Sequence, residues 1–457
     1  MRTSSRSRNT PATQLSWRPE RPRRGTSRGA HRRTRLLAAA SLAAAAGLVV
    51  ALGQPGQALE RPDGAGVSAA RGGADARQRA QLEQLAEKLV AEGAPGVIVR
   101  VNDGSGRPVE IIEQAPWARK DHRLRADDEF RMGSNTKTVM ATLVLQLVAE
   151  GKLALTDSIE TWLPGQVPDG GAITLRMLLN HTSGLYDYTQ QPAILPSLLG
   201  KDQRHWTSAQ LLALGVRHKP LFTPGTRWSY SNTNYAAIGA VLEKVTGDSL
   251  ADLVRDRIAR PLGLTHTYYA TDGTWRGRHA LGTEPDAAHM PPGVPAEFRE
   301  YGGVPSREGR VDVSDNNPSW GGAAGAIVST ARDWDRFYRA LMSGKLLPAA
   351  QLAQMRTTVP TSPDQPDGPR AGLGISNITT ECGTLWAHDG GIPGYFSTNF
   401  TDSTGRRTAS VLVTTEAFAE FSEAFPKLDG ASQALMTASM CAMLGKPVPS
   451  GTGSSQD

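Results

Sequence analysis

Short β-strand patterns at both ends of the chain, with a long helical middle between them, most constrain how this sequence can fold. Residues 96–101 alternate apolar and polar side chains, Asp103-Gly104 forms a turn and residues 109–112 return, which predicts a hairpin. Three further strand patterns lie far downstream, at residues 385–388, 395–401 and 408–414. The sequence therefore predicts an α+β fold in which both chain ends build one antiparallel sheet.

Helical patterns flank these strands and fill the middle of the chain. Leucines recur at helical spacing over residues 75–92, and residues 418–444 predict a closing helix. Residues 130–362 are mostly helical, with long loops that contain Pro and Gly. We expect the terminal helices to flank the sheet, and an active site to form where the sheet meets the large helical insertion.

The first 58 residues have the composition of an export signal. They contain eleven Arg and one acidic residue, and an uncharged apolar run at residues 36–52 leads to small residues that end at Ala58. We expect a signal peptide over residues 1–58 and a secreted protein, with Arg32-Arg33 compatible with a twin-arginine route. A retained membrane anchor is the alternative, and membrane contact is expected only through this segment if it is uncleaved.

The basic character of the chain is confined to this segment. The formal net charge is +6, and since residues 1–58 contribute +10, the rest carries −4. No basic stripe with interleaved aromatic residues follows, which argues against nucleic-acid binding. We expect a linker over residues 59–74, one domain over residues 75–445 and a flexible tail over residues 446–457.

Ser134 and Lys137 lie three residues apart at the start of a helical pattern that is apolar nearly all round. At this spacing both side chains share one helix face, so the ammonium can reach the hydroxyl. Burial lowers the pKa of a lysine, which would allow Lys137 to accept the proton of a serine nucleophile. Taken alone, the pair is better explained as a helix N-cap followed by a solvated lysine.

Tyr230-Ser231-Asn232 follows a Pro-Gly turn and precedes a helical pattern. A phenol can relay a proton, and an amide two residues away can orient a substrate carbonyl or a lysine. Taken alone, this motif is better explained as an Asn or Ser helix cap beside a packed tyrosine.

His388-Asp389-Gly390-Gly391 lies at a predicted strand. Glycines in a strand let another backbone approach closely. The N–H of Gly391, paired with that of Ser134, could then form an oxyanion hole. A glycine-rich turn at a strand end is the alternative.

Motifs for other chemistry are missing from the sequence. After residue 58 it has no glycine-rich phosphate loop, no His-Glu-x-x-His, no Cys-x-x-Cys and no G-x-S-x-G, so we expect no metal and no cofactor. The only two cysteines, Cys382 and Cys441, follow the export signal and most economically form one disulfide. Two buried thiols are the alternative.

In this order, the three motifs resemble those of the penicillin-recognising serine hydrolases, which include class C β-lactamases, DD-peptidases and related esterases. The resemblance runs from about Gln81 to Leu444 and is nearest to the soluble D-alanyl-D-alanine carboxypeptidases. It implies a β-lactamase/transpeptidase-like fold. Further matching stretches are residues 178–188, 223–225, 230–235 and 324–330.

The resemblance also implies roles for individual residues. Ser134 would attack the scissile carbonyl and become acylated, while Lys137 and Tyr230 would carry its proton to the leaving amine. His181 and Ser183 match as well, and we interpret them as scaffold. The positions that would bind substrate are Asn232, Trp320, His388, Gly390 and Gly391.

Two positions depart from the carboxypeptidase pattern. Such enzymes carry hydroxyl residues at the positions where this chain has Asp389 and Gly391. They also carry an Arg shortly upstream. Together these groups bind the terminal carboxylate of the substrate. Residues 372–388 contain no Arg. An ionised Asp389 about 4 Å from a substrate carboxylate would cost about 4 kcal/mol at an effective dielectric constant of about 20.

The sequence predicts an exported serine acyl hydrolase. We expect first a D-alanyl-D-alanine carboxypeptidase that acts on peptidoglycan peptides and binds β-lactams. The alternatives on the same scaffold are an esterase, a D-amino-acid amidase or a class C-like β-lactamase that takes a small acyl substrate. A non-catalytic penicillin-binding sensor or cell-wall-binding module is the alternative from another class.

Overall fold

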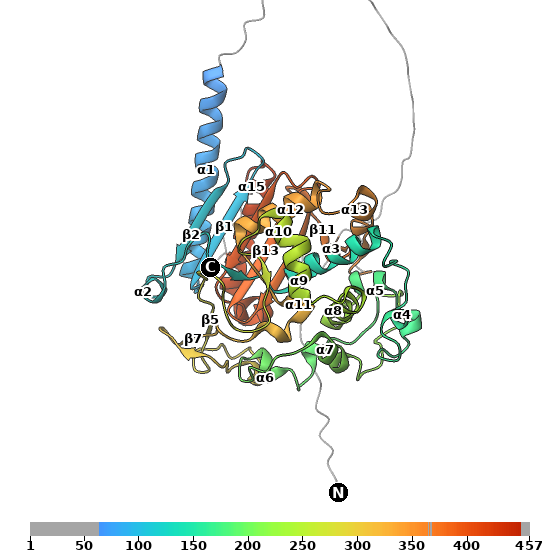
Figure 1. Cartoon of the computed structure of the whole chain (residues 1–457). Helices are drawn as coiled ribbons and strands as arrows, with labels where there is room; N and C mark the ends of the chain where they lie inside the picture. The colour runs from blue at the N-terminus through green and yellow to red at the C-terminus, as the bar shows by residue number, and fades with distance from the viewer. Residues whose placement is uncertain (1–63, 364, 366–367, 449–457) are drawn as a thin grey trace, which may run out of the picture. The chain divides into compact units, whose positions relative to one another are not determined.

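The computed structural model describes residues 64–448, except residues 364 and 366–367 (Figure 1). The chain divides into two compact units, with a boundary between Ala76 and Arg77. The elements below belong to the unit that contains residues 77–448, apart from the beginning of α1 (Gly64–Ala91). The predicted signal peptide lies outside the described residues, and so do residues 59–63 and 449–457.

The main sheet is antiparallel and joins strands from both ends of the described chain (Figure 1). Its strand order is β2-β1-β14-β13-β12-β11-β10-β9. Val97 of β1 lies opposite Val413 of β14, so the first strand pairs directly with the last. The predicted α+β architecture is confirmed. The strands are β1 (Gly96–Asn102), β2 (Val109–Gln114), β9 (Val359–Pro360), β10 (Arg370–Ala371), β11 (Ser376–Thr380), β12 (Gly383–Ile392), β13 (Tyr395–Thr401) and β14 (Thr408–Val413).

Helices cover the two faces of this sheet. Thr398 of β13 contacts Met436 of α15 (Pro426–Met443), whereas Thr408 of β14 donates a hydrogen bond to Asp335 of α12 (Ala331–Met342). Thr398 pairs with Val411, three residues beyond Thr408, and side chains an odd number of residues apart project from opposite faces. Therefore α15 and α12 lie on opposite sides of the sheet.

The chain between β2 and β9 forms the predicted helical insertion, with two small three-stranded sheets of order β3-β8-β4 and β5-β7-β6. Its strands are β3 (Phe130–Arg131), β4 (Tyr268–Tyr269), β5 (Thr283–Pro285), β6 (Val304–Pro305), β7 (Arg310–Asp312) and β8 (Ile327–Ser329). Its α-helices are α2 (Ala118–Asp121), α3 (Thr136–Ala149), α4 (Ile159–Trp162), α5 (Leu175–Leu179), α6 (Leu195–Leu198), α7 (Ser208–Gly215), α8 (Asn232–Thr246), α9 (Leu250–Val254), α10 (Arg260–Leu262), α11 (Gly322–Gly325), α12 and α13 (Ala349–Met355). Shorter 3₁₀ turns are η1 (Gly133–Asn135), η2 (Gly170–Ala172), η3 (Tyr188–Gln190), η5 (Ala296–Phe298) and η6 (Pro318–Trp320), and a π-helical turn (Arg255–Ala259) joins α9 to α10.

The helix α3 is central to the hydrophobic core. Nearly every side chain from Thr136 to Leu147 is buried, and the helix packs against α8, α11 and α13. A helix that is apolar on all sides is stable only when it is surrounded by protein. Thr136, Lys137 and Thr138 at its N-terminal end are therefore buried away from water.

Two predicted boundaries are corrected. The first helix begins at Gly64 instead of Asp75, so residues 64–74 of the predicted linker are helical, and their alanines have high helix propensity. The predicted closing helix is interrupted: α14 (Ala417–Glu420) is followed by η7 (Ser422–Ala424), and α15 starts at Pro426. The residue before a proline is disfavoured in helical conformation, which explains the break. Within residues 64–448, none of the described helices is long and apolar enough to span a membrane.

The structure contains the disulfide expected from the sequence. Cys382 lies in the turn between β11 and β12, Cys441 lies in α15, and their Cα atoms are 5.1 Å apart. The bridge therefore links α15 to the beginning of β12, the strand that carries the third motif.

Replacing both cysteines, by Cys382→Ser with Cys441→Ser, should lower the free energy of unfolding by about 4 kcal/mol, because the bridge closes a loop with a sequence separation of 59 residues. Urea unfolding of the oxidised wild type and the double variant measures this difference. The reduced wild type should match the double variant. Coinciding curves for the oxidised wild type and the double variant would contradict the prediction.

Candidate active site

Lys137 lies at the centre of the site and contacts three oxygen atoms. Its Nζ lies 2.9 Å from Ser134 Oγ, 2.8 Å from Asn232 Oδ1 and 2.9 Å from the Ala324 carbonyl oxygen. The two oxygens on Asn232 and Ala324 can only accept hydrogen bonds, whereas a hydroxyl can also donate one. A neutral Lys137 therefore directs its two N–H groups to these acceptors and its lone pair to the Ser134 hydroxyl.

Burial makes this neutral form accessible. Lys137 is 0% exposed, and the loss of water lowers its pKa to about 7. The negative charges of Asp187 and Asp389 act in the opposite direction and keep the pKa from falling further. A substantial fraction of Lys137 is thus unprotonated near neutral pH and can act as a base.

Tyr230 lies beside this pair in its protonated form. Burial raises the pKa of its phenol well above 10, although an interaction with Ser134 lowers it in part. Lys137 Nζ lies 4.8 Å from the centre of the Tyr230 ring. A phenol with such a high pKa is not the initial base, but it can pass a proton to a leaving group.

Two histidine contacts fix the tyrosine motif. The ring of His181 stacks on that of Tyr230 with centroids 4.4 Å apart, and its Nδ1 accepts a hydrogen bond from the Ser231 amide at 3.2 Å. Ser183 donates to Asn234 Oδ1. Both residues therefore contact the scaffold around the motif.

Asp187 is a residue of the site that the sequence analysis did not single out. Asn232 Nδ2 donates to Asp187 Oδ2 at 2.9 Å, while Asn232 Oδ1 accepts from Lys137. Because the carboxylate can only accept, it fixes the amide with its oxygen toward the lysine. Asp187 lies within the stretch 178–188 that carries the resemblance, but neither spacing nor composition distinguished it as a site residue.

The third motif brings its backbone against the serine. A Cβ on Gly390 would lie 2.1 Å from the Met132 carbonyl oxygen and 2.6 Å from the Ser134 nitrogen, and one on Gly133 would lie 2.9 Å from the Gly391 nitrogen. Only glycines allow β12 and η1 to approach this closely. The amides of Ser134 and Gly391 therefore lie on adjoining segments, as an oxyanion hole requires.

His388 is neutral and does not balance the charge of its neighbour. Burial and the Lys137 charge lower the pKa of His388 to about 3. Its Nδ1–H donates to the Asp389 carbonyl oxygen at 2.6 Å. The Asp389 side chain, 36% exposed, has a raised pKa because of partial burial, against which Lys137 acts. An ionised Asp389 would therefore repel a substrate carboxylate without compensation by His388.

Trp320 lies in η6, at the start of the segment that leads into α11. It is 9% exposed and belongs to the hydrophobic core, and its carbonyl oxygen accepts a hydrogen bond from Tyr188 at 2.8 Å. The structure thus brings together six of the predicted residues: Ser134, Lys137, Tyr230, Asn232, Gly390 and Gly391. His388 lies on β12, two residues before Gly390.

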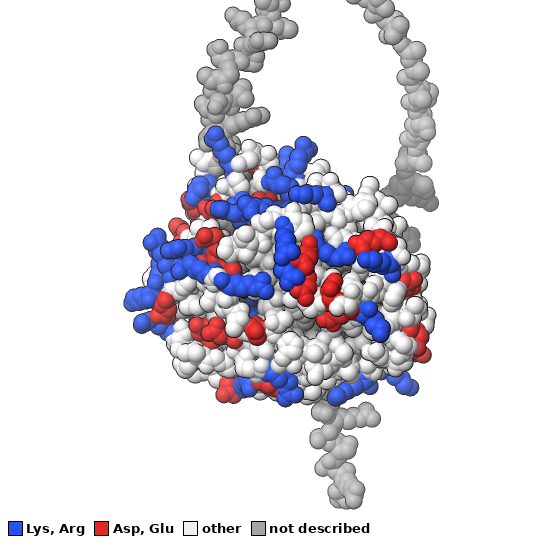
Figure 2. All heavy atoms as spheres, in the orientation of Figure 1, with Lys and Arg blue, Asp and Glu red and all other residues white. Residues whose placement is uncertain are grey.

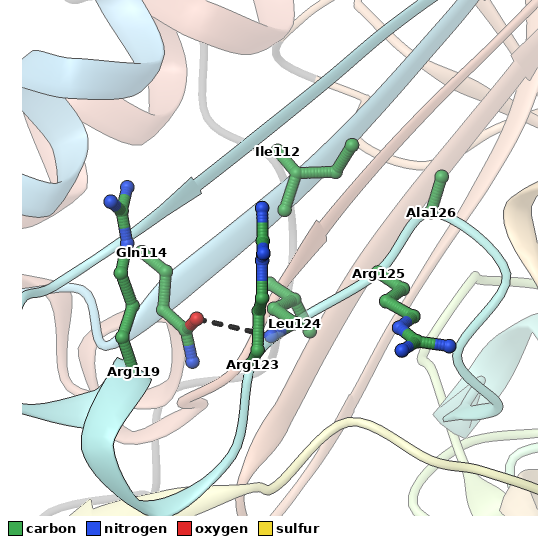
Figure 3. A pocket seen from close by; sticks show the side chains of 7 residues that line it. All are labelled: Ile112, Gln114, Arg119, Arg123, Leu124, Arg125 and Ala126. Carbon is green, nitrogen blue, oxygen red and sulfur yellow. Dashed lines mark hydrogen bonds between the residues drawn. The ribbon is translucent and has the colours of Figure 1, made fainter.

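A separate cavity of about 760 Å³ opens beside the edge strand β2 (Figure 3). Gln114 accepts a hydrogen bond from the Leu124 amide at 3.0 Å, which holds the wall of the cavity to the strand. Basic side chains concentrate around α2 on the face that Figure 2 shows. No predicted site residue lines this cavity, which is bordered by Ile112, Gln114, Arg119, Arg123, Leu124, Arg125 and Ala126.

Comparison with known proteins connects this geometry to one family. The family model described as Beta-lactamase matches residues 82–429. Among solved structures, a D-stereospecific amidohydrolase from Streptomyces sp. is 36% identical with a TM-score of 0.65, and the match covers 76% of this chain and 98% of that chain.

Curated relatives match over shorter stretches. The putative penicillin-binding protein PbpX of Bacillus subtilis (strain 168) is 29% identical over 281 residues, 60% of this chain and 62% of that protein. A putative D-alanyl-D-alanine carboxypeptidase of Escherichia coli (strain K12) is 36% identical over 151 residues, 31% of this chain and 33% of that protein. The chain spans between 50% and 66% of the length of the first four curated relatives it matches.

The rate of ester cleavage should depend on the protonation of Lys137. We expect kcat/KM for p-nitrophenyl acetate to rise with pH through about 7, because only the neutral amine accepts the Ser134 proton. In Asp389→Asn the rise should move to lower pH, because a charge that raises the pKa of Lys137 is gone. A pH profile of Asp389→Asn that is unchanged, or shifted upward, would contradict this assignment.

Gly390→Ala should lower kcat by about 100- to 1,000-fold, the usual effect of losing an oxyanion-hole donor, since the new Cβ forces β12 away from Ser134. Gly430→Ala in α15 is the matched control, because nothing lies within 4 Å of its new Cβ. Circular dichroism checks that both variants fold. Wild-type kcat in Gly390→Ala would disprove the close approach.

Proposed function

The chain belongs to the beta-lactamase family of penicillin-recognising serine hydrolases, and on that premise we propose that it is a serine amidohydrolase that cleaves an amide bond beside a D-amino acid residue. The observation that carries the proposal is the hydrogen bond between the buried Lys137 and Ser134. The similarity to a D-stereospecific amidohydrolase over 98% of that chain supports the substrate class.

Acylation begins with proton transfer from Ser134 to the neutral Lys137. The serine oxygen attacks the scissile carbonyl carbon, and the N–H groups of Ser134 and Gly391 stabilise the oxyanion. Lys137 then returns the proton through Tyr230 to the leaving nitrogen. The C–N bond breaks, the amine departs and the acyl-enzyme remains.

Deacylation repeats these steps with water. A water molecule gives one proton to Lys137 and attacks the ester carbonyl carbon, and the same two amides stabilise the oxyanion. The ester bond breaks as the Ser134 oxygen takes the proton back. The acid product is released and Lys137 is neutral again.

A D-alanyl-D-alanine carboxypeptidase that acts on peptidoglycan peptides and binds β-lactams is the second candidate. The order of the three motifs and the similarity to a putative enzyme of that name favour it. The charge of Asp389, which the neutral His388 does not balance, stands against it. Residues 1–58 support the further proposal that the protein is exported.

The two candidates differ in the substrate that is cleaved. We expect Ser134-dependent hydrolysis of D-phenylalanine amide, at least about tenfold faster in kcat/KM than the L-enantiomer, since stereospecific contacts of this size are worth about 1.4 kcal/mol. Ammonia release by the full chain is the measurement, and Ser134→Ala is the control.

The opposite outcome identifies the other candidate. Faster release of D-alanine from diacetyl-L-Lys-D-Ala-D-Ala than of ammonia from any D-amide would replace the amidohydrolase by the carboxypeptidase. Cleavage of p-nitrophenyl acetate alone, abolished in Ser134→Ala, would indicate an esterase.

A further inference from the structure

The edge strand β2 has backbone groups that lack hydrogen-bond partners. Just after β2, the Ala115 amide donates to the Pro95 carbonyl oxygen at 2.9 Å, so the backbone groups of Ala115 point toward β1. Successive residues of an antiparallel strand direct these groups to opposite sides. Those of Ile112 and Gln114 therefore point away from β1, and no group in the described part of the chain hydrogen-bonds to them.

The opposite edge of the sheet is protected. The strand β9 has only two residues, Val359 and Pro360, and a proline has no N–H to donate. In contrast, β2 has six residues and no proline. Short strands and prolines prevent an exposed edge from pairing with another chain, so the β2 edge is the one that can accept a further strand.

The cavity shown in Figure 3 opens beside this edge, on the face of the sheet that α12 covers. Arg100 of β1 forms ion pairs with Glu110 of β2 and with Asp335 of α12. Ile112 and Gln114 lie two and four residues after Glu110, so their side chains project from this same face. Both residues line the cavity, which therefore adjoins the unpaired edge.

The cavity is basic. Its lining contains three arginines, Arg119, Arg123 and Arg125, and no acidic residue. The side chains of Arg123 and Arg125 form no ion pair or hydrogen bond with a described residue, whereas Arg119 lies 3.7 Å from a carboxylate oxygen of Glu113. Arg119 and Arg123 extend in the same direction (Figure 3). Guanidinium groups without a bound anion can hold carboxylates through paired hydrogen bonds.

The acidic residues nearest in sequence do not neutralise these arginines. Asp121 forms an ion pair with Arg307, and Asp128 forms one with Arg278, both at 2.7 Å. Asp127 is exposed and forms no ion pair with a residue that the structure describes. The cavity therefore keeps a positive charge that an anionic ligand can balance.

We propose that the β2 edge and the basic cavity together bind an extended acidic peptide segment of a partner protein. The peptide backbone pairs with Ile112 and Gln114, and every second side chain of the peptide faces the cavity, where carboxylates meet Arg119 and Arg123. A phosphate polymer would use the arginines but not the strand edge, so the unpaired backbone favours a peptide. The proposal is independent of the amidohydrolase function, because no predicted site residue lines the cavity.

Four probes test the charge and the backbone separately. They are acetyl-Thr-Glu-Val-Glu-Thr-amide, the same peptide with Gln in place of Glu, the acidic peptide with every amide between its residues N-methylated, and sodium polyphosphate. We expect the acidic peptide to bind about 10- to 100-fold more tightly than the neutral one, the value of a charged hydrogen bond. N-methylation should weaken binding at least about tenfold, because it removes backbone donors. Calorimetry with the full chain gives each Kd.

Variants connect this preference to the cavity. Arg119→Gln and Arg123→Gln should each reduce the ratio of Kd between the neutral and acidic peptides by about tenfold. Arg107→Gln is the matched control and should keep the wild-type ratio, because Arg107 is exposed in the turn before β2 and does not line the cavity. All three arginines are exposed, and circular dichroism checks that the variants fold.

Different results would overturn the proposal in different ways. Equal Kd values for the acidic and neutral peptides, or a preference that both cavity variants keep, would exclude the arginines. Undiminished binding of the N-methylated peptide, or tighter binding of polyphosphate than of the acidic peptide, would make the cavity a general anion site. Sedimentation of the protein alone as a dimer that the acidic peptide dissociates would assign the edge to a second copy of this chain.

Discussion

The burial of one lysine among three oxygen atoms is the interaction on which the site depends. Lys137 is surrounded by Ser134, Asn232 and Ala324, which come from η1, α8 and α11, so three parts of the insertion must be in place for its hydrogen bonds to form. Water is excluded because α3 is buried along nearly all of its length and packed within the core. The packing of α3 that stabilises the fold therefore also lowers the pKa of Lys137. The same buried residues thus contribute to both stability and catalysis.

The negatively charged residues near Lys137 have two different roles. Asp187 is hydrogen-bonded and acts through Asn232, whose orientation it fixes toward the lysine. Asp389 has no such hydrogen bond to the catalytic motifs, and the resemblance to carboxypeptidases implies a hydroxyl side chain at its position. The catalytic residues thus match those that the resemblance implies, whereas Asp389 puts a negative charge where carboxypeptidases have a hydroxyl group. We expect this difference in charge to decide which substrate class is bound.

Local patterns predicted much of the fold and the centre of the site. The strand patterns at both chain ends predicted one sheet, and the spacing of Ser134 and Lys137 predicted their contact, because both signals depend on residues close in sequence. Asp187 reaches the site only through the tertiary fold, which brings it to Asn232, and no sequence motif distinguishes it. The sequence analysis missed two helix boundaries: the break before Pro426, which a local proline rule explains afterwards, and the start of the first helix at Gly64.

The pairing of β1 with β14 has a consequence for the newly made chain. Val97 finds its partner at Val413, more than three hundred residues later, so the two strands cannot meet until almost the whole polypeptide has left the ribosome. Contacts this distant in sequence slow folding, because a long loop must close before they stabilise anything. Until then β1 exposes an unpaired edge, and the nascent chain is most vulnerable to aggregation over that interval.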